Sequence, residues 1–155
     1  MLKIYPAQTE EDFEVAKKLL AEYADSLGFD LSFQDFEQEL EDLSNHFSSS
    51  DDRLLLAIDK NQAIGCVAIK RFDNSICEMK RLYVKTQFRG SGIGRALAEA
   101  AIKYAQKAGY NCIRLDMVLP REAARNLYFS LGFKDIEPYR YNPMERAVFM
   151  ELKLV

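Results

Sequence analysis

The chain has 155 residues, 48% of them hydrophobic and 29% charged, which is the composition of one ordinary globular domain covering residues 1–155. Its net charge of −3 argues against a nucleic-acid-binding protein, and no apolar run approaches the ~20 residues that cross a bilayer, so we expect no membrane span. The N-terminal residues lack a basic stretch followed by an apolar run and a cleavage site, which predicts a cytoplasmic protein.

The first third of the chain predicts a strand followed by two amphipathic helices. The strand covers about residues 2–5. A capping pattern at residues 9–12 precedes apolar residues at helical spacing up to residue 27, and a second cap at residues 32–35 precedes another helix that continues to residue 47.

The rest of the chain alternates strands and helices. In chain order we expect strands at 54–58, 63–69 and 76–84, a helix at about 92–108, a strand at 112–117, a helix at 121–130, an extended segment after Gly132 and a closing strand at 147–154. The turn-rich residues 59–62 predict a hairpin between the second and third strands. The order β-α-α-β-β-β-α-β-α-β-β is that of a mixed α/β layer fold.

The cysteines and the histidine offer no metal or disulfide pattern. Cys66, Cys77 and Cys112 are odd in number, have no close spacing and lie in apolar runs, which predicts buried, reduced thiols. His46 is the single histidine and has no partner at ligand spacing. We therefore expect no metal cofactor.

A glycine-rich turn joins the strand at 76–84 to the long helix that follows it. Its sequence is Arg89-Gly90-Ser91-Gly92-Ile93-Gly94, and Arg95 follows at once. The start of a helix exposes N–H groups without intrahelical partners and carries partial positive charge, and glycines let an anion approach the backbone closely. Basic residues gather around this turn and suit a small polyanionic ligand: Lys80, Arg81, Lys85, Arg89 and Arg95.

The spacing of the glycines excludes the common nucleotide-binding loops. The P-loop requires a lysine that is absent here. The dinucleotide fingerprint requires glycine or alanine at its last position, where the two registers place Arg95 and Leu97. A tight strand-to-helix turn without a ligand is the simpler alternative, but three glycines in five residues between two arginines are more than such a turn requires.

This turn resembles the Arg/Gln-x-x-Gly-x-Gly/Ala signature of the GNAT superfamily of N-acetyltransferases. Residues 78–84 are similar to the strand that precedes the signature in that family, and residues 124–133 are similar to its Ala-x-x-Leu-Tyr-x-x-x-Gly-Phe segment. The element order also fits, so the resemblance covers essentially the whole chain. It implies a central mixed, mostly antiparallel sheet that is flanked by helices and splays open after the strand at 76–84.

The resemblance also implies a binding mode for acetyl-CoA, the acetyl donor in that family. It places the pyrophosphate on the backbone of residues 89–94, with Arg95 beside them, and the pantetheine arm along Leu82, Tyr83 and Val84. Relatives carry Asn or Ser just before the helix at 121–130, where this chain has Leu119-Pro120-Arg121, so that contact does not carry over. Asn126 is the candidate that takes over this contact with the pantetheine arm.

Transfer to an amine requires a base for the ammonium proton and an acid for the leaving thiolate. Glu78 is the candidate base, since strict alternation places it on the apolar strand face of Leu82 and Val84; the alternative is a strand carboxylate paired with a neighbouring cation. Tyr128 matches the family tyrosine that donates a proton to the thiolate. Its alternative role is packing within its helix.

The acceptor is an amine, and an amino acid, a small amine and a protein amine all stay open. Residues of the early helices and the late segment line the acceptor side in this family, which makes Phe33, Tyr139 and Tyr141 candidates. Arg81 or Arg140 would bind a substrate carboxylate and so favour an amino-acid-like acceptor.

Two other functions compete with the enzyme. A non-catalytic acyl-CoA-binding or sensor module would keep the glycine turn but would need neither Glu78 nor Tyr128. A structural, dimer-forming domain would use the glycines only to close a turn. Homodimers are common in the family, although no pattern in this chain indicates an interface.

Overall fold

The computed structural model describes residues 1–27, 36–47, 51–117, 122–142 and 147–155. Its elements, in chain order, are β1 (Leu2–Pro6), α1 (Glu10–Leu27), α2 (Phe36–Glu41), α3 (Leu43–His46), β2 (Arg53–Asp59), β3 (Gln62–Arg71), β4 (Ile76–Val84), the 3₁₀ turn η2 (Thr86–Phe88), α4 (Ile93–Lys107), β5 (Cys112–Met117), α5 (Glu122–Ser130), β6 (Lys134–Ile136) and β7 (Val148–Lys153). The expected mixed, mostly antiparallel sheet flanked by helices is confirmed.

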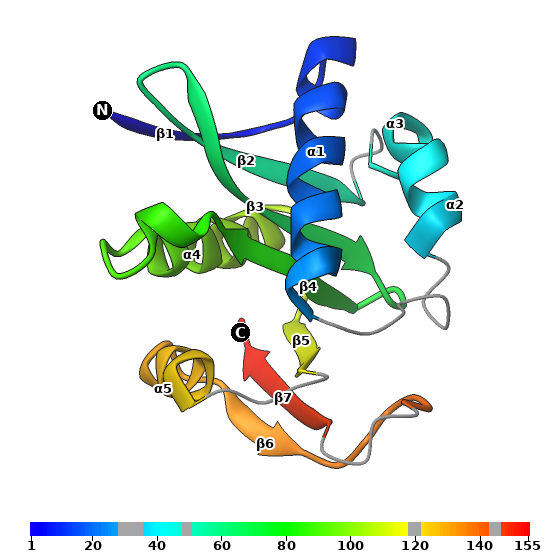
Figure 1. The fold of residues 1–155 in the computed structure, drawn as a ribbon. Helices are drawn as coiled ribbons and strands as arrows, with labels where there is room; N and C mark the ends of the chain where they lie inside the picture. Colours follow the sequence, from blue (N-terminus) through cyan, green and yellow to red (C-terminus); the bar gives the residue numbers. More distant parts are fainter. Residues whose placement is uncertain (28–35, 48–50, 118–121, 143–146) are drawn as a thin grey trace.

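The strands form a seven-stranded sheet in the order β1-β2-β3-β4-β5-β7-β6. Among the strand pairs of the described residues, only β4 and β5 run parallel. Helices α1, α2 and α3 cover one face of the sheet, and α4 and α5 lie on the opposite face (Figure 1). One apolar core lies between the sheet and α4, and a second lies between β2–β4 and the first three helices.

Local sequence signals fix several of these elements. At the start of α1, the amide of Asp12 donates to Thr9 Oγ1 over 3.0 Å and the amide of Thr9 donates to Asp12 Oδ2 over 3.1 Å, so the predicted cap is a reciprocal capping box. The β2–β3 hairpin turns on Lys60 and Asn61, whose φ values of 50° and 62° are those of the tight turn that matches strand twist. Both predictions are confirmed.

The second predicted helix is two short helices. The helical run of α2 ends at Glu41, and Asp42, with φ −125° and ψ 39°, interrupts it before α3 begins. The side-chain amide of Asn45 donates to Asp42 Oδ1 over 2.6 Å, a local bond that competes with helix propagation. The predicted cap at residues 32–35 lies outside the described residues.

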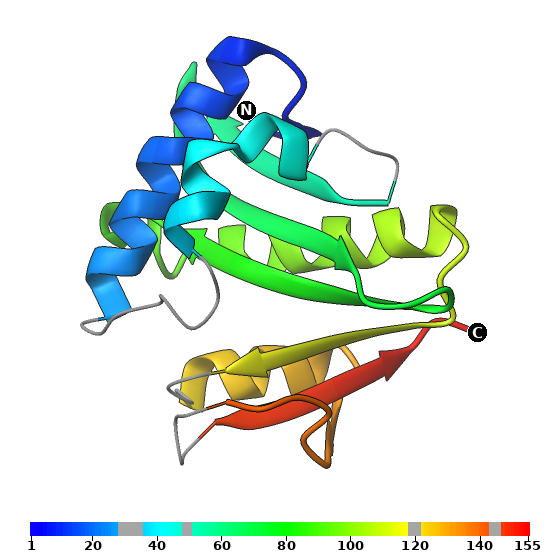
Figure 2. The ribbon, with the colours of Figure 1, turned by 90° about the vertical axis from the view of Figure 1, so that its right-hand side faces the viewer.

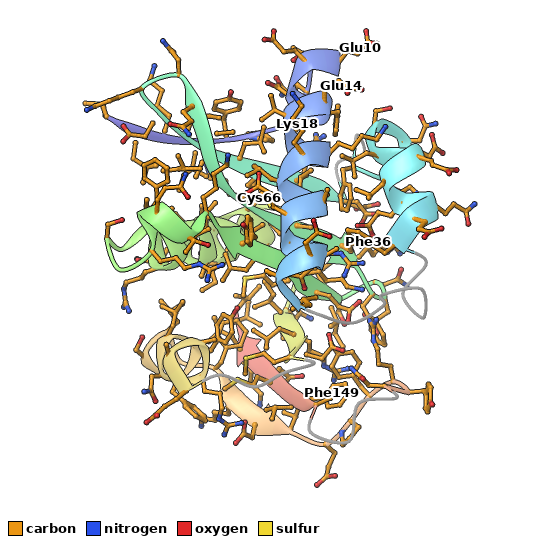
Figure 3. All side chains as sticks on the ribbon, viewed as in Figure 1. Glu10, Glu14, Lys18, Phe36, Cys66 and Phe149 are labelled. Atoms are coloured by element: carbon orange, nitrogen blue, oxygen red, sulfur yellow. The ribbon has the colours of Figure 1, made fainter. Side chains whose placement is uncertain are left out.

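The three cysteines are free and buried, as predicted. Cys66 belongs to the core beneath α1, which also contains Phe36 at the start of α2 (Figure 3). Burial raises the pKa of the Cys66 thiol to about 12, and burial does the same for Cys77. These thiols are therefore unreactive packing groups at neutral pH.

A bulge in β4 changes which way its side chains point. Cys66 and Ala68 of β3, two residues apart, pair with Tyr83 and Lys80 of β4, three residues apart, so β4 carries one extra residue here. Arg81 lies in this extra stretch and adopts a left-handed φ of 61°. The bulge exchanges the two faces of the strand beyond it.

A buried ion pair holds the bulge in place. Arg81 Nε lies 3.2 Å from Glu39 Oε2 on α2, and the two side chains are only 2% and 4% exposed. The guanidinium group also lies 5.0 Å from the ring centroid of Phe36, and Lys70 approaches Glu39 Oε1 at 3.8 Å. These contacts offset the cost of about 1–2 kcal/mol for a left-handed non-glycine residue.

We predict that Glu39→Gln destabilises the protein by about 3–5 kcal/mol, because it leaves the charge of Arg81 buried without its counter-ion. Urea unfolding followed by circular dichroism measures this loss. Glu41→Gln, an exposed position on the same helix, is the control and should stay within about 0.5 kcal/mol of the parent. A Glu39→Gln variant as stable as Glu41→Gln would show that the pair does not hold the bulge.

Candidate functional site

The two parallel strands at the centre of the sheet, β4 and β5, separate after a short stretch of pairing. Ile76, Cys77 and Glu78 pair with Cys112, Ile113 and Arg114, and the pairing ends there. Beyond this point β4 runs on to Val84 and β5 to Met117, and Figure 2 shows the two strands diverging. The splay implied by the sequence resemblance is therefore present.

A cavity of about 390 Å³ lies between the separated strands. This is within the range of roughly 300–1,000 Å³ that is typical of small-ligand sites. Its lining comes from the end of α1 (Tyr23, Ser26, Leu27), β4 from Met79 to Val84, Arg89, Gly94, β5 from Leu115 to Met117, and α5 (Ala123, Ala124, Leu127, Tyr128). Two strands, two helices and the glycine-rich turn thus meet at one site.

The turn before α4 has the geometry of an anion site. Gly90 and Gly92 adopt φ values of 82° and 85°, and Gly92 caps the helix without any side-chain hydrogen bond. A Cβ at either glycine would meet no atom within 4 Å, so the space beside the backbone is open. Since α4 has 15 residues, its first N–H groups carry a full share of helix-dipole charge.

The charged groups around the turn are already oriented. Arg89 Nε donates to the carbonyl of Val84 over 2.9 Å, and its guanidinium group lies 5.7 Å from the ring centroid of Tyr83. Arg95 reaches away toward Ser130 Oγ, at 2.8 Å, and Glu99, at 3.3 Å. Ser91 Oγ donates to the carbonyl of Phe88 over 2.6 Å and so tightens the turn.

Tyr128 presents a protonated phenol to the cavity. Its side chain is 6% exposed and packs edge-to-face on Phe133, with ring centroids 5.5 Å apart. Burial, and to a smaller extent the nearby Tyr23, raise the pKa of Tyr128, so the hydroxyl keeps its proton at neutral pH. No described residue forms a hydrogen bond with this hydroxyl, which leaves it available to a ligand.

Glu78 does not have the surroundings that strict alternation predicts. Because of the bulge, Leu82 and Val84 pack in the α4-side core with Cys77 and Met79, so Glu78 faces the opposite side of the sheet and that prediction is wrong. Its carboxylate contacts Arg140 Nη2 and accepts a hydrogen bond of 2.8 Å from the hydroxyl of Tyr139.

The carboxylate of Glu78 is therefore paired with Arg140, a cation far away in the sequence, and not with its sequence neighbours Lys80 and Arg81. Glu78 is 5% exposed and is not among the residues that line the cavity. An aromatic group stabilises the pair: Tyr139 packs on Phe72 and on Phe149 of β7, with centroids 5.3 Å apart in both contacts.

The other predicted site residues fall into two groups. Leu82, Tyr83, Val84, Arg81, Arg89 and Gly94 line the cavity together with Tyr128. The predicted residues that do not line it are Gly90, Ser91, Gly92, Ile93, Arg95, Asn126, Tyr139 and Tyr141. Asn126 is exposed on α5, and Tyr141 is 83% exposed. Phe33 lies outside the described residues.

Among the cavity residues that were not predicted as site residues, three have titratable side chains: Tyr23, Lys80 and Asp116. Asp116 had a visible signal, because it is a carboxylate in the otherwise apolar end of the strand at 112–117. Lys80 stood out only as one of several basic residues, and its place in the cavity depends on the splay. Tyr23 lies in a helical apolar pattern and could not be told from a packing residue.

Comparison with known proteins assigns the family. The sequence profile of the acetyltransferase (GNAT) family matches residues 15–133, which is more than half of the chain. The chain belongs to the GNAT family. It is therefore an acyltransferase, and the acetyltransferases of this family use acetyl-CoA as co-substrate.

Two curated relatives illustrate the similarity. The chain is 36% identical to an uncharacterized N-acetyltransferase of Schizosaccharomyces pombe over 155 residues, covering 99% of this chain and 95% of that protein. It is 34% identical to N-acetylaspartate synthetase of Danio rerio over 103 residues, covering 61% of this chain and 36% of the relative.

Solved structures agree on the fold. A GNAT-family acetyltransferase of Staphylococcus aureus superposes with a TM-score of 0.81 at 18% identity and covers 100% of both chains. The PaiA N-acetyltransferase of Thermoplasma acidophilum, solved in complex with coenzyme A, gives a TM-score of 0.76 at 22% identity and covers 99% of both chains.

The described part of the chain offers two further observations. None of its helices combines the length and apolar character that a bilayer span requires. Nor do its His, Cys, Asp and Glu side chains gather anywhere in a group able to hold a metal ion.

Proposed function

We propose that this GNAT-family protein transfers the acetyl group of acetyl-CoA to a primary amine by direct attack within a ternary complex. The observation that carries the proposal is the cavity between β4 and β5, which reaches the glycine turn through Arg89 and Gly94 and has the phenol of Tyr128 in its wall. A single continuous site thus offers an anion cradle, a strand edge and a proton donor.

The donor would bind through the backbone. The N–H groups of residues 89–94 hold the pyrophosphate at the positive end of α4, with Arg89 and Arg95 adding charge nearby. The pantetheine arm lies along Leu82, Tyr83 and Val84, on the side of β4 that β5 has left. Asn126, exposed on α5, is proposed to contact the same arm from outside the cavity.

The amine nitrogen attacks the thioester carbonyl, the C–S bond breaks, and the products are an amide and the free thiol of coenzyme A. Glu78 takes the proton of the attacking amine, through a water molecule because its carboxylate does not line the cavity. Tyr128 gives its proton to the leaving thiolate. Two groups on separate elements thus handle the two protons.

The acceptor is proposed to be a free amine of an amino acid or a small amine, with a protein amine as the alternative. The relative named N-acetylaspartate synthetase supports an amino acid. Arg81 and Arg140 are each paired with a glutamate, Glu39 and Glu78, so neither is the first choice for a substrate carboxylate.

Turnover tests this function directly. The protein is incubated with acetyl-CoA and a panel of amines. Release of the coenzyme A thiol is followed with a colorimetric thiol reagent, and the acetylated product is identified by mass spectrometry. Release that depends on the amine supports the proposal. Tight acetyl-CoA binding without release from any amine would instead identify an acyl-CoA-binding module.

We predict that Glu78→Gln lowers kcat by about 100-fold and leaves acetyl-CoA affinity unchanged, because the amide keeps the shape of the side chain but cannot accept the proton. Steady-state kinetics and calorimetry measure the two quantities. Glu151→Gln is the matched control, since Glu151 also pairs with an arginine, Arg114, at 2.7 Å, but lies on β7 outside the cavity. Equal kcat values for the two variants would show that Glu78 is not the general base.

A further inference from the structure

Two opposite charges face each other across the mouth of the strand splay. Glu78 and Arg114 form the last registered pair between β4 and β5. Two residues further along each strand, on the same face, come Lys80 and Asp116, which continued pairing would have placed opposite one another. Because the strands have separated, both side chains line the cavity instead.

Lys80 and Asp116 do not form an ion pair with each other. Lys80 forms no ion pair or hydrogen bond with any residue that the structure describes, whereas every arginine near it in the fold has a partner of its own. Asp116 Oδ2 accepts a hydrogen bond of 3.1 Å from the side-chain amide of Asn142, which fixes the carboxylate at the end of β5. The two groups interact electrostatically, since Asp116 is among the charges that raise the pKa of Lys80.

We propose that Lys80 and Asp116 together recognise a zwitterionic acceptor, a free α-amino acid, with its carboxylate on Lys80 and its ammonium group on Asp116. The inference rests on the proposed acetyl transfer and names the substrate class of that site. A simple amine would leave Lys80 in the cavity without a counter-ion among the described residues, and burying an unpaired charge is costly. A zwitterion matches both charges and needs no further ion.

Ionisation of Lys80 provides a second, independent readout. Burial lowers the pKa of Lys80 to about 8, helped by the cations and opposed by the carboxylates around it. The groups that face it are Glu78 and Arg81 from β4, Asp116 from β5, Arg140 from the segment before β7 and the phenol of Tyr23 from α1.

The ammonium form of Lys80 is present below that pKa and is lost as the pH rises through about 8. Lys80-dependent capture of a carboxylate therefore weakens above this pH. In Lys80→Arg, whose guanidinium stays charged, it should persist to higher pH.

The decisive experiment compares amino acids with their own amides as acceptors, because an amide keeps the ammonium group and removes the carboxylate. We expect kcat/KM to be about 10- to 100-fold higher for the acids, in line with one charge-assisted contact. Lys80→Met should erase this preference by lowering kcat/KM for the acids alone. Asp116→Asn should raise KM for acids and amides alike, since both carry the ammonium group.

Lys103→Met, an exposed lysine on α4, removes the same charge outside the site and should keep the preference. Amides that are acetylated as well as the acids, or a Lys80→Met variant that loses both equally, would overturn the zwitterion and leave acetyl transfer standing. A protein that acetylates none of these amines would overturn acetyl transfer itself, and the acceptor assignment with it.

Discussion

Gly92→Ala is expected to weaken acetyl-CoA binding by about 10- to 100-fold, the cost of disturbing one or more charge-assisted contacts to phosphate. Gly92 has a φ of 85° and caps α4 with no side chain of its own. The added methyl group would meet no protein atom within 4 Å, so it enters the open space that the pyrophosphate is proposed to fill. Isothermal calorimetry with acetyl-CoA measures the change in Kd.

The same helix offers a matched control for this substitution. Gly109, just beyond the other end of α4, has a φ of 89°, and a Cβ there would also meet nothing within 4 Å. Gly92→Ala and Gly109→Ala should therefore lose similar stability, about 1–2 kcal/mol each, from the left-handed backbone alone. Only Gly92→Ala should lose ligand affinity, and equal affinity in the two variants would place the pyrophosphate elsewhere.

Much of the fold follows from local signals in the sequence. The capping box of Thr9 and Asp12 and the tight turn at Lys60 and Asn61 depend on residues within four positions of each other, and both are present as predicted. The glycine turn is also local, so its position before α4 could be located from spacing alone.

The bulge in β4 could not be predicted, and it changed the interpretation of the site. It depends on Arg81, whose strained backbone is held by an ion pair with Glu39, 42 residues away. Strict alternation therefore placed Glu78 on the wrong face of the strand. Long-range contacts of this kind carry no short-range signal, since neither partner is unusual in its own segment.

The cavity residues show the same division. Tyr128 lies in a motif and could be singled out, and it does line the cavity. Lys80 and Asp116 line one cavity only because β4 and β5 pair over three residues and then separate. Their juxtaposition is a property of the sheet, and it becomes visible only in three dimensions.

Tyr128→Phe is expected to lower kcat by about 100- to 1,000-fold, within the usual contribution of a general acid, with little change in acetyl-CoA affinity. Phenylalanine preserves the edge-to-face contact with Phe133, whose ring centroid lies 5.5 Å away, so the loss would reflect the missing hydroxyl. Because burial raises the pKa of Tyr128, the phenol stays protonated through neutral pH, and its titration should lower the rate only at strongly alkaline pH.

The cavity contains a second phenol that makes this test discriminating. Tyr23 also lines it, and its pKa is likewise raised by burial. A thiolate of pKa ~8.5 needs only one proton as it leaves, so one phenol suffices. We expect Tyr23→Phe to change kcat by no more than a few-fold, measured by thiol release under the same conditions. If Tyr23→Phe shows the large loss and Tyr128→Phe does not, the proton comes from α1, and the assignment carried by the Leu-Tyr motif fails.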